Sequence, residues 1–248
     1  MAPKLPVLKI LRDALRILRL RRGAIAQTLI LPVGALATVH ATSQAAGSGR
    51  FGLSPWFVYT LTAVLVVRIA TSCHRLVYLP KAEWPGPIRA PWTRRETRYL
   101  LYALSLGALV FFLNMLQVVV LILVGQTWVQ NPTDNLPRWL VLVLQSPALY
   151  VLGRFSMVLP ATAMDHKADL LSSWENTRGN GWRIFVIAAG LPSILGTVLG
   201  VLHRENATAL ELLALAALSV VLIVFQVASL SLAYRELSMA QAHAGATG

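Results

Sequence analysis

The sequence predicts an all-α protein that is built as a polytopic transmembrane helix bundle, with about six spans and an N-terminal amphipathic interfacial helix. The chain of 248 residues is 56% hydrophobic and only 13% charged, whereas soluble domains carry about a quarter charged residues. Its apolar residues fall in long blocks, each close to the ~20 residues that a helix needs to cross the hydrocarbon core of a bilayer. Basic residues separate these blocks, as they do in multi-pass membrane proteins.

Residues 1–23 predict a basic amphipathic helix. Basic side chains recur at spacings of three, four and three residues, which places them along one helix face, with isoleucine and leucine on the other. We expect this helix to lie in the membrane interface, because a span follows within a few residues. Packing of the helix on the protein's own cytoplasmic loops is the alternative. The basic residues that would face the membrane surface are Lys9, Arg12, Arg16 and Arg19.

Six candidate spans follow, and they define a transmembrane domain over residues 24–236 with a short tail of small residues, 237–248. The first span is the weakest, because Gln27, Thr28 and Pro32 interrupt it. Proline inside a span is tolerated where neighbouring helices or local kinks satisfy the freed carbonyls. The spans are Ala24–Thr42, Trp56–Val77, Tyr99–Gly125, Trp139–Met164, Trp182–Leu202 and Thr208–Tyr234.

The connection between the second and third spans contains four prolines and two tryptophans, so it cannot be helical throughout. We expect an extended segment that lies against the lipid headgroups. Thr93 followed by Glu96 matches a capping box, so the third helix is expected to begin as early as Arg94.

The basic residues also orient the chain. With the N-terminus in the cytoplasm, 17 of the 22 Lys and Arg residues fall in cytoplasmic segments and three in outer segments. Both termini are therefore predicted to be cytoplasmic. This placement explains the net charge of +12 better than nucleic-acid binding does, so no nucleic-acid partner is expected. The expected partners are membrane lipids, preferentially anionic ones, and other membrane subunits.

The connection between the fourth and fifth spans is the most distinctive stretch, and it carries a candidate lipid or anion site. Asp169 and Gly179 are placed to begin and end a short helix. Asn180 can cap the fifth span, and Arg178 and Arg183 then flank the N-terminus of that helix. Such an arrangement suits the phosphate of a lipid headgroup. An amphipathic loop without a specific ligand is the alternative that the same residues leave open.

Charged and polar residues inside the spans are functional candidates, because they are costly in lipid. Arg68 and Arg154 either snorkel to lipid phosphate, or they line a polar cavity or bind an anionic headgroup between helices. Asn114 and Gln117 lie on one face of the third span, where they either hold helices together or line a transport path. A stripe of small residues on the fifth span is typical of close helix packing. Its members are Ala189, Ser193, Gly196 and Gly200.

Motifs for catalysis or metal binding do not occur in the sequence. The five histidines and the single cysteine show no metal-ligand spacing, and no P-loop or GxSxG pattern is present. We expect no catalytic residue, metal or cofactor. Two function classes remain. The favoured one is a non-catalytic accessory or scaffold subunit, or a lipid-interacting component, of a membrane complex. The alternative is a transporter or channel-like protein for a small or lipidic substrate.

The fourth-to-fifth connection resembles a recurring pattern in uncharacterised bacterial inner-membrane proteins. There, a helix that ends in Arg-(x)-Ser-x-Val-Leu-Pro-Ala is followed by Ser-Trp, Thr-Arg-Gly-Asn and Trp-Arg. Cys73, His74 and Arg75 also resemble that group, whose hydropathy is similar to that of the membrane domain accompanying some glycerophosphoryl diester phosphodiesterases. The phosphodiesterase domain has no counterpart in this sequence, so the resemblance implies a six-helix bacterial inner-membrane protein without that activity. The matching residues are Arg154, Ser156, Val158, Leu159, Pro160, Ala161, Ser173, Trp174, Thr177, Arg178, Gly179, Asn180, Trp182 and Arg183.

Overall fold

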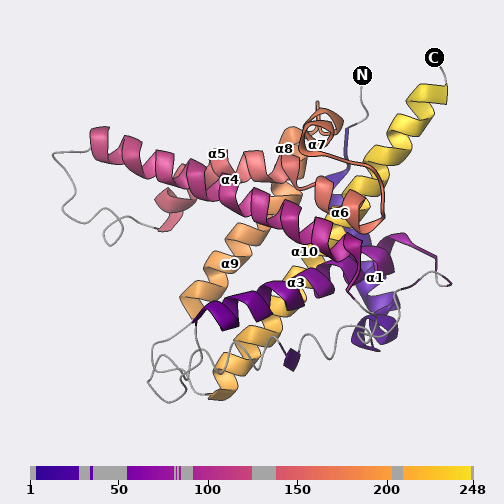
Figure 1. Ribbon diagram of the computed structural model, residues 1–248, viewed down its shortest axis with the longest axis horizontal. Coiled ribbons are helices and arrows are strands. Elements are labelled where there is room, and N and C mark those ends of the chain that lie inside the picture. The colour runs from indigo at the N-terminus through magenta and orange to yellow at the C-terminus, as the bar shows by residue number, and fades with distance from the viewer. Residues whose placement is uncertain are drawn as a thin grey trace.

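Every regular element that the structure describes is a helix (Figure 1). The structure is a computed structural model, and it describes residues 4–27, 34–35, 55–80, 82, 84, 92–124, 138–202 and 209–246. The helices are α1 (Val7–Leu20), α3 (Pro55–Tyr78), α4 (Arg94–Val124), α5 (Arg138–Phe155), α6 (Val158–Ala163), α7 (Leu170–Asn176), α8 (Gly181–Phe185), the π-helical segment η2 (Val186–Gly190), α9 (Leu191–Leu202) and α10 (Ala209–Ala246).

Four helical segments within the described residues are long and apolar enough to cross a membrane. They agree with the predicted second, third, fifth and sixth spans, and they indicate a multi-pass membrane protein. The predicted first span, Ala24–Thr42, lies largely outside the described residues, so the count of six stays a prediction. The four segments are Trp56–Tyr78 in α3, Arg94–Val119 in α4, Gly181–Val201 across α8, η2 and α9, and Ala217–Ala240 in α10.

The predicted fourth span, Trp139–Met164, is not one continuous helix. Helix α5 ends at Phe155, and α6 begins three residues later. The break lies four residues before Pro160, which has no N–H to donate to the carbonyl of Ser156. Leu159 N donates to that carbonyl instead, at 3.0 Å, and Pro160 sits in the first turn of α6, where its missing N–H has little cost.

The predicted tail from residue 237 onward is helical as far as Ala246, because α10 continues beyond the predicted end of the sixth span. Contacts with the N-terminal segment hold this extension. Leu237 is buried in the core, and Lys9 Nζ lies 3.2 Å from the Glu236 carboxylate. Alanine, which recurs in the last two turns, is also the strongest helix former.

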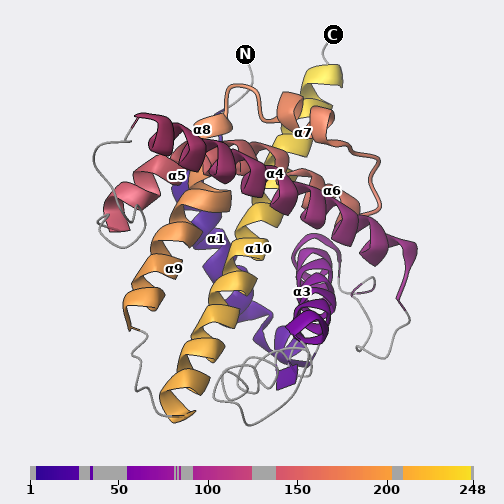
Figure 2. The same cartoon turned by 60° about the vertical axis from the view of Figure 1, so that its left-hand side comes forward.

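Helix α10 is the centre of the packing, and α1 and α3 lie against it (Figure 2). The largest buried cluster joins residues of α1, α3, α8, η2 and α10. Ile10 and Ala14 contribute to this cluster, so the apolar face of α1 packs partly on protein. Leu8 and Leu20 of the same helix are exposed. The position of α1 in the membrane interface stays a prediction.

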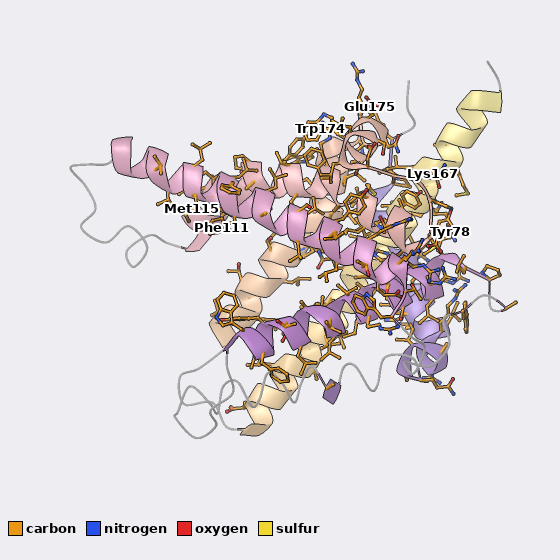
Figure 3. The ribbon with its side chains drawn as sticks, viewed as in Figure 1. Tyr78, Phe111, Met115, Lys167, Trp174 and Glu175 are labelled. Carbon is orange, nitrogen blue, oxygen red and sulfur yellow. The ribbon has the colours of Figure 1, made fainter. Side chains whose placement is uncertain are left out.

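Helix α4 crosses the pair formed by α9 and α10 instead of running beside it, as both views show (Figures 1 and 2). It packs on α5 and α6, and in the view of Figure 1 its outer half extends to the left beyond α9 and α10. Phe111 and Met115 lie on this outer half and are exposed (Figure 3). The four membrane-length segments are therefore not aligned as a parallel bundle within the described part of the chain.

Prolines inside the apolar helices leave carbonyl groups that polar side chains satisfy. Pro192 has no N–H for the carbonyl of Ala188 in η2, and Gln226 Nε2 of α10 donates to that oxygen at 2.9 Å. Within α5, Pro147 has no N–H for the carbonyl of Val143. The hydroxyl of Ser146 donates to that oxygen at 2.7 Å. The glutamine thus joins two spans, and the serine repairs its own helix.

Candidate functional site

The segment between α6 and α8 folds into a cap over one end of the helices. Asp169 begins α7 with a capping box: its carboxylate accepts from Ser172 N at 2.7 Å, and Asp169 N donates to Ser172 Oγ at 2.9 Å. Gly179, with φ of 79°, ends the segment in the left-handed conformation that glycine adopts without strain. Both positions confirm the sequence prediction. Trp174 and Glu175 mark this short helix in Figure 3.

Arg154 fixes α7 to the end of α5. Its guanidinium is buried, stacks on the Trp174 ring with 3.6 Å to the ring centroid, and donates through Nε to Thr177 Oγ1 at 3.0 Å. It also donates to the backbone carbonyl of Trp174. Ser173 Oγ returns a hydrogen bond to the carbonyl of Arg154 at 2.8 Å. The arginine that the sequence placed beside lipid phosphate is therefore engaged with the protein itself.

Asp165 ties the connecting loop to two other helices. Its carboxylate accepts from Arg95 Nε of α4 at 3.0 Å and lies 3.7 Å from Arg75 Nη1 of α3. The hydrogen bond from Arg95 is the main cause that holds the pKa of Asp165 below its usual value, and the charges of Arg75 and Arg98 act in the same direction. Asp165 has φ of 60°, so its backbone is strained to make this contact.

A buried polar chain joins α3, α4 and α10 just below this loop. His74 is fully buried, with Nδ1 2.6 Å from Ser231 Oγ and Nε2 3.3 Å from the Tyr99 hydroxyl. Ser231 Oγ donates to the carbonyl of Val227 at 2.8 Å, so its oxygen is left to accept from His74 Nδ1–H. Nε2 then accepts from Tyr99. Each polar group of the chain has a partner, which identifies it as an interhelical lock.

A polar cavity of about 490 Å³ opens beside the loop, between the start of α4, α6 and the first turn of α7. Its volume lies within the range of small-ligand sites in proteins. Lys167 lies on the loop at this place and is labelled in Figure 3. The polar and charged residues of its wall are Arg98, Tyr102, Thr162, Asp165, His166, Lys167, Asp169 and Ser172.

The predicted lipid-binding residues do not converge on one site. Arg178 is exposed and Arg183 is partly exposed, and neither side chain makes a hydrogen bond or ion pair with a described residue. Asn180 occupies the N-cap position of α8, but its side chain does not cap that helix. Its Oδ1 accepts from Leu5 N at 2.9 Å, and the residue is buried. Arg68 lies on α3, with its guanidinium 5.5 Å from the centroid of the Trp92 ring.

The basic residues of α1 lie on its outer side. Lys9, Arg12, Arg16 and Arg19 are all exposed, because the opposite face of the helix packs against α10. Of these, Lys9 is paired with Glu236. The row thus points away from the core, and its position at a membrane surface stays a prediction.

The predicted packing residues are used differently from each other. Ala189 is buried, but a Cβ added at Gly196 or Gly200 would meet nothing within 4 Å, so these two glycines bring no described helix close. Ser193 is half-exposed on the same helix. Asn114 Nδ2 donates to the carbonyl of Val110 in its own helix at 2.9 Å, and Gln117 is half-exposed.

The close helix contact lies instead at two glycines that the sequence analysis did not single out. A Cβ added at Gly153 of α5 would lie 2.9 Å from the Cα atom of Phe185, and one at Gly181 of α8 would clash with the Tyr150 hydroxyl. Both glycines permit the contact between α5 and α8. Gly153 precedes Arg154 inside the predicted fourth span, and Gly181 precedes Trp182 at the start of the predicted fifth span, which is a weak signal in the sequence.

Metal binding finds no support in the described residues, where no group of three or more His, Cys, Asp or Glu side chains is placed to hold an ion. Comparisons with protein-family models, with curated proteins and with solved structures give no match. The resemblance of the fourth-to-fifth connection stays a prediction, and the chemistry of the cap rests on its own geometry.

Proposed function

We propose that this chain is a non-catalytic integral membrane protein that acts as an accessory or scaffold subunit of a membrane complex and binds anionic lipid at its cytoplasmic end. Four apolar helices make it compatible with a multi-pass membrane protein. The observation that carries the proposal is the contrast between two sets of polar groups. Buried groups such as Arg154 and His74 are paired with other groups of the fold, whereas Arg12, Arg16 and Arg178 are exposed and Arg183 is partly exposed.

The internal pairing favours a scaffold over a transport path. Arg154 and Gln226 each form bonds that hold two segments together, and Asn114 bonds within its own helix. A transport path needs polar groups that exchange partners with a substrate, so groups with fixed internal partners support structural use. The transporter alternative is supported only by the exposed polar residues of the cap.

Lipid binding is tested with the double variant Arg178→Gln, Arg183→Gln. Each basic residue near an anionic surface contributes about 1 kcal/mol, so the two together give about a thirtyfold preference for anionic over zwitterionic lipid if their effects add. Native mass spectrometry of both forms in mixed phosphatidylglycerol and phosphatidylcholine measures the preference. Equal retention of phosphatidylglycerol by variant and parent would show that these arginines only set the topology.

The scaffold role predicts a stable partner. Purification in a gentle detergent, followed by identification of co-purifying proteins, should recover at least one membrane protein in a fixed ratio. A strictly solitary protein that conducts a substrate in vesicles would favour the transporter class instead.

The proposed placement is the bacterial inner membrane with both termini in the cytoplasm. It is supported by the excess of basic residues in the connections on one side. Reporter fusions after Trp84, Asp169 and Asn206 test it, and an outside signal at Trp84 would refute the topology.

A further inference from the structure

The polar cavity of the cap contains more positive than negative charge. Arg98 and Lys167 line it, and Arg75 and Arg95 form ion pairs with Asp165. The cavity and its immediate surroundings therefore hold four basic side chains and the two carboxylates of Asp165 and Asp169. Both carboxylates are already used within the fold. Asp165 is bonded to Arg95, and Asp169 accepts from Ser172 N.

The hydroxyl groups of the wall are also used by the fold. Tyr102 donates to the carbonyl of Ala168 at 3.0 Å, Thr162 donates to the carbonyl of Val158 at 2.8 Å, and Ser172 donates to the carbonyl of Asp169 at 2.9 Å. Each of these hydroxyls therefore stabilises the shape of the cavity and has no second proton to offer a ligand.

Arg98 and Lys167 are the exceptions among the lining residues. Both line the cavity and are exposed, and neither side chain forms a hydrogen bond or an ion pair within 4 Å with any described residue. Arg98 reaches Asp165 only as a longer-range charge. His166 also lines the cavity, and its ring is held through Nδ1, which lies 2.8 Å from the Tyr234 hydroxyl.

We infer that this cavity is a binding site for a phosphate group, with Arg98 and Lys167 as its cationic ligands. A guanidinium presents a planar fork to two phosphate oxygens, and an ammonium adds a compact charge to a third. The inference deepens the proposed lipid binding. Two sources can supply the phosphate: a lipid headgroup, for which the inference rests on the proposed function, and a soluble phosphate. The cap is the scaffold of the site, since Tyr102 and the bonds of Asp165 hold the loop that bears Lys167.

The test compares three forms of the full chain in a neutral detergent: the parent, Arg98→Gln with Lys167→Gln, and the matched control Lys4→Gln with Arg22→Gln. All four side chains are exposed, so both variants are expected to fold, which thermal unfolding checks. Calorimetric titration with inorganic phosphate at fixed ionic strength should show one site in the parent and in the control. The cavity variant should bind phosphate about thirtyfold more weakly, because two basic residues are lost.

A second arm identifies the source of the phosphate. In native mass spectra, added inorganic phosphate should displace one phosphatidylglycerol from the parent if a lipid headgroup occupies the cavity, and none from the cavity variant. Phosphate binding without displacement of lipid would assign the site to a soluble phosphate. A third variant, Tyr102→Phe, keeps all charges and should weaken phosphate binding by freeing the loop.

Two results would overturn the inference. One is equal loss of phosphate binding in the control and in the cavity variant, which would indicate diffuse surface charge. The other is a parent that binds no phosphate, together with a cavity variant that retains as many phosphatidylglycerol molecules as the parent. In that second case a clear preference of the parent for anionic lipid would leave the proposed function standing, so the two failures are distinguishable.

Discussion

The hydrogen bond between Gln226 and the carbonyl of Ala188 should depend on Pro192. The proline removes the N–H that a regular helix would offer to this oxygen, and Gln226 Nε2 donates to it from α10 at 2.9 Å. Interhelical hydrogen bonds in membrane proteins contribute about 0.6 kcal/mol on average and about 1.7 at most. An unsatisfied carbonyl costs about 1–3 kcal/mol. We therefore expect Gln226→Met, a change of similar shape, to lower the free energy of unfolding by about 1 kcal/mol.

The same change should cost little when residue 192 carries an N–H. In the Pro192→Ala background the backbone can donate to Ala188 O itself, so the cost of Gln226→Met should fall to about 0.3 kcal/mol or less, which is the usual error of additivity. The coupling energy of the double-mutant cycle is then about 1 kcal/mol. Reversible unfolding in mixed detergent micelles, followed by circular dichroism, measures the four forms.

A matched control is available on another helix. Gln117 of α4 is half-exposed, and its amide makes no hydrogen bond with a described residue, so Gln117→Met should change stability by less than about 0.5 kcal/mol. If Gln226→Met costs the same with and without the proline, the hydrogen bond does not compensate for Pro192, and this account of the α9–α10 contact fails.

Three further predictions address the rest of the fold. Gly153→Ala should destabilise the protein by about 1–3 kcal/mol, because its Cβ would lie 2.9 Å from the backbone of Phe185, whereas Gly196→Ala meets open space and should be neutral or stabilising in the same unfolding assay. Arg154→Lys should cost about 2 kcal/mol and expose α7 to protease, because one ammonium cannot replace the guanidinium that binds Thr177 and Trp174, whereas Arg178→Lys should leave both readouts unchanged. The pKa of Asp165 is lowered first by the hydrogen bond from Arg95, so this carboxylate stabilises the fold above its unfolded pKa of about 3.9, and the stability is lost as the pH falls through the lower folded pKa. Arg95→Gln should reduce this loss of stability in acid. An unchanged dependence of stability on pH would contradict the ion pair.

Local signals in the sequence predicted several helix ends well. Thr93 N donates to Glu96 Oε2 at 2.8 Å, and α4 begins at Arg94 as expected. Asp169 caps the start of α7 as expected, and Gly179 adopts the left-handed conformation three residues after that helix ends. Caps depend on groups within three or four residues of each other, so composition and spacing are enough to find them.

Side chains with distant partners were predicted less well. The partner of Asn180 is Leu5 N, 175 positions away, and the partners of Arg154 lie across a helix break that the sequence did not place. In both cases the residue type suggested an exposed polar role, and tertiary packing buried it. The stripe at Gly196 and Gly200 shows the reverse, since its spacing suggested close packing that the described helices do not make.

Polar residues inside apolar helices are weak evidence of a transport path in this chain, because backbone groups account for several of them. Ser146 and Gln226 each donate to a carbonyl that a proline leaves without its usual N–H. Arg21 performs the same task at a helix end, where its guanidinium donates to the carbonyls of Leu76 and Leu79 in the last turn of α3 and the residue after it. Lipid offers no hydrogen bonds to such carbonyls, so each proline and each helix end in the membrane requires a polar side chain nearby. A polar residue within a span therefore indicates a ligand site only where it has no such backbone carbonyl to satisfy.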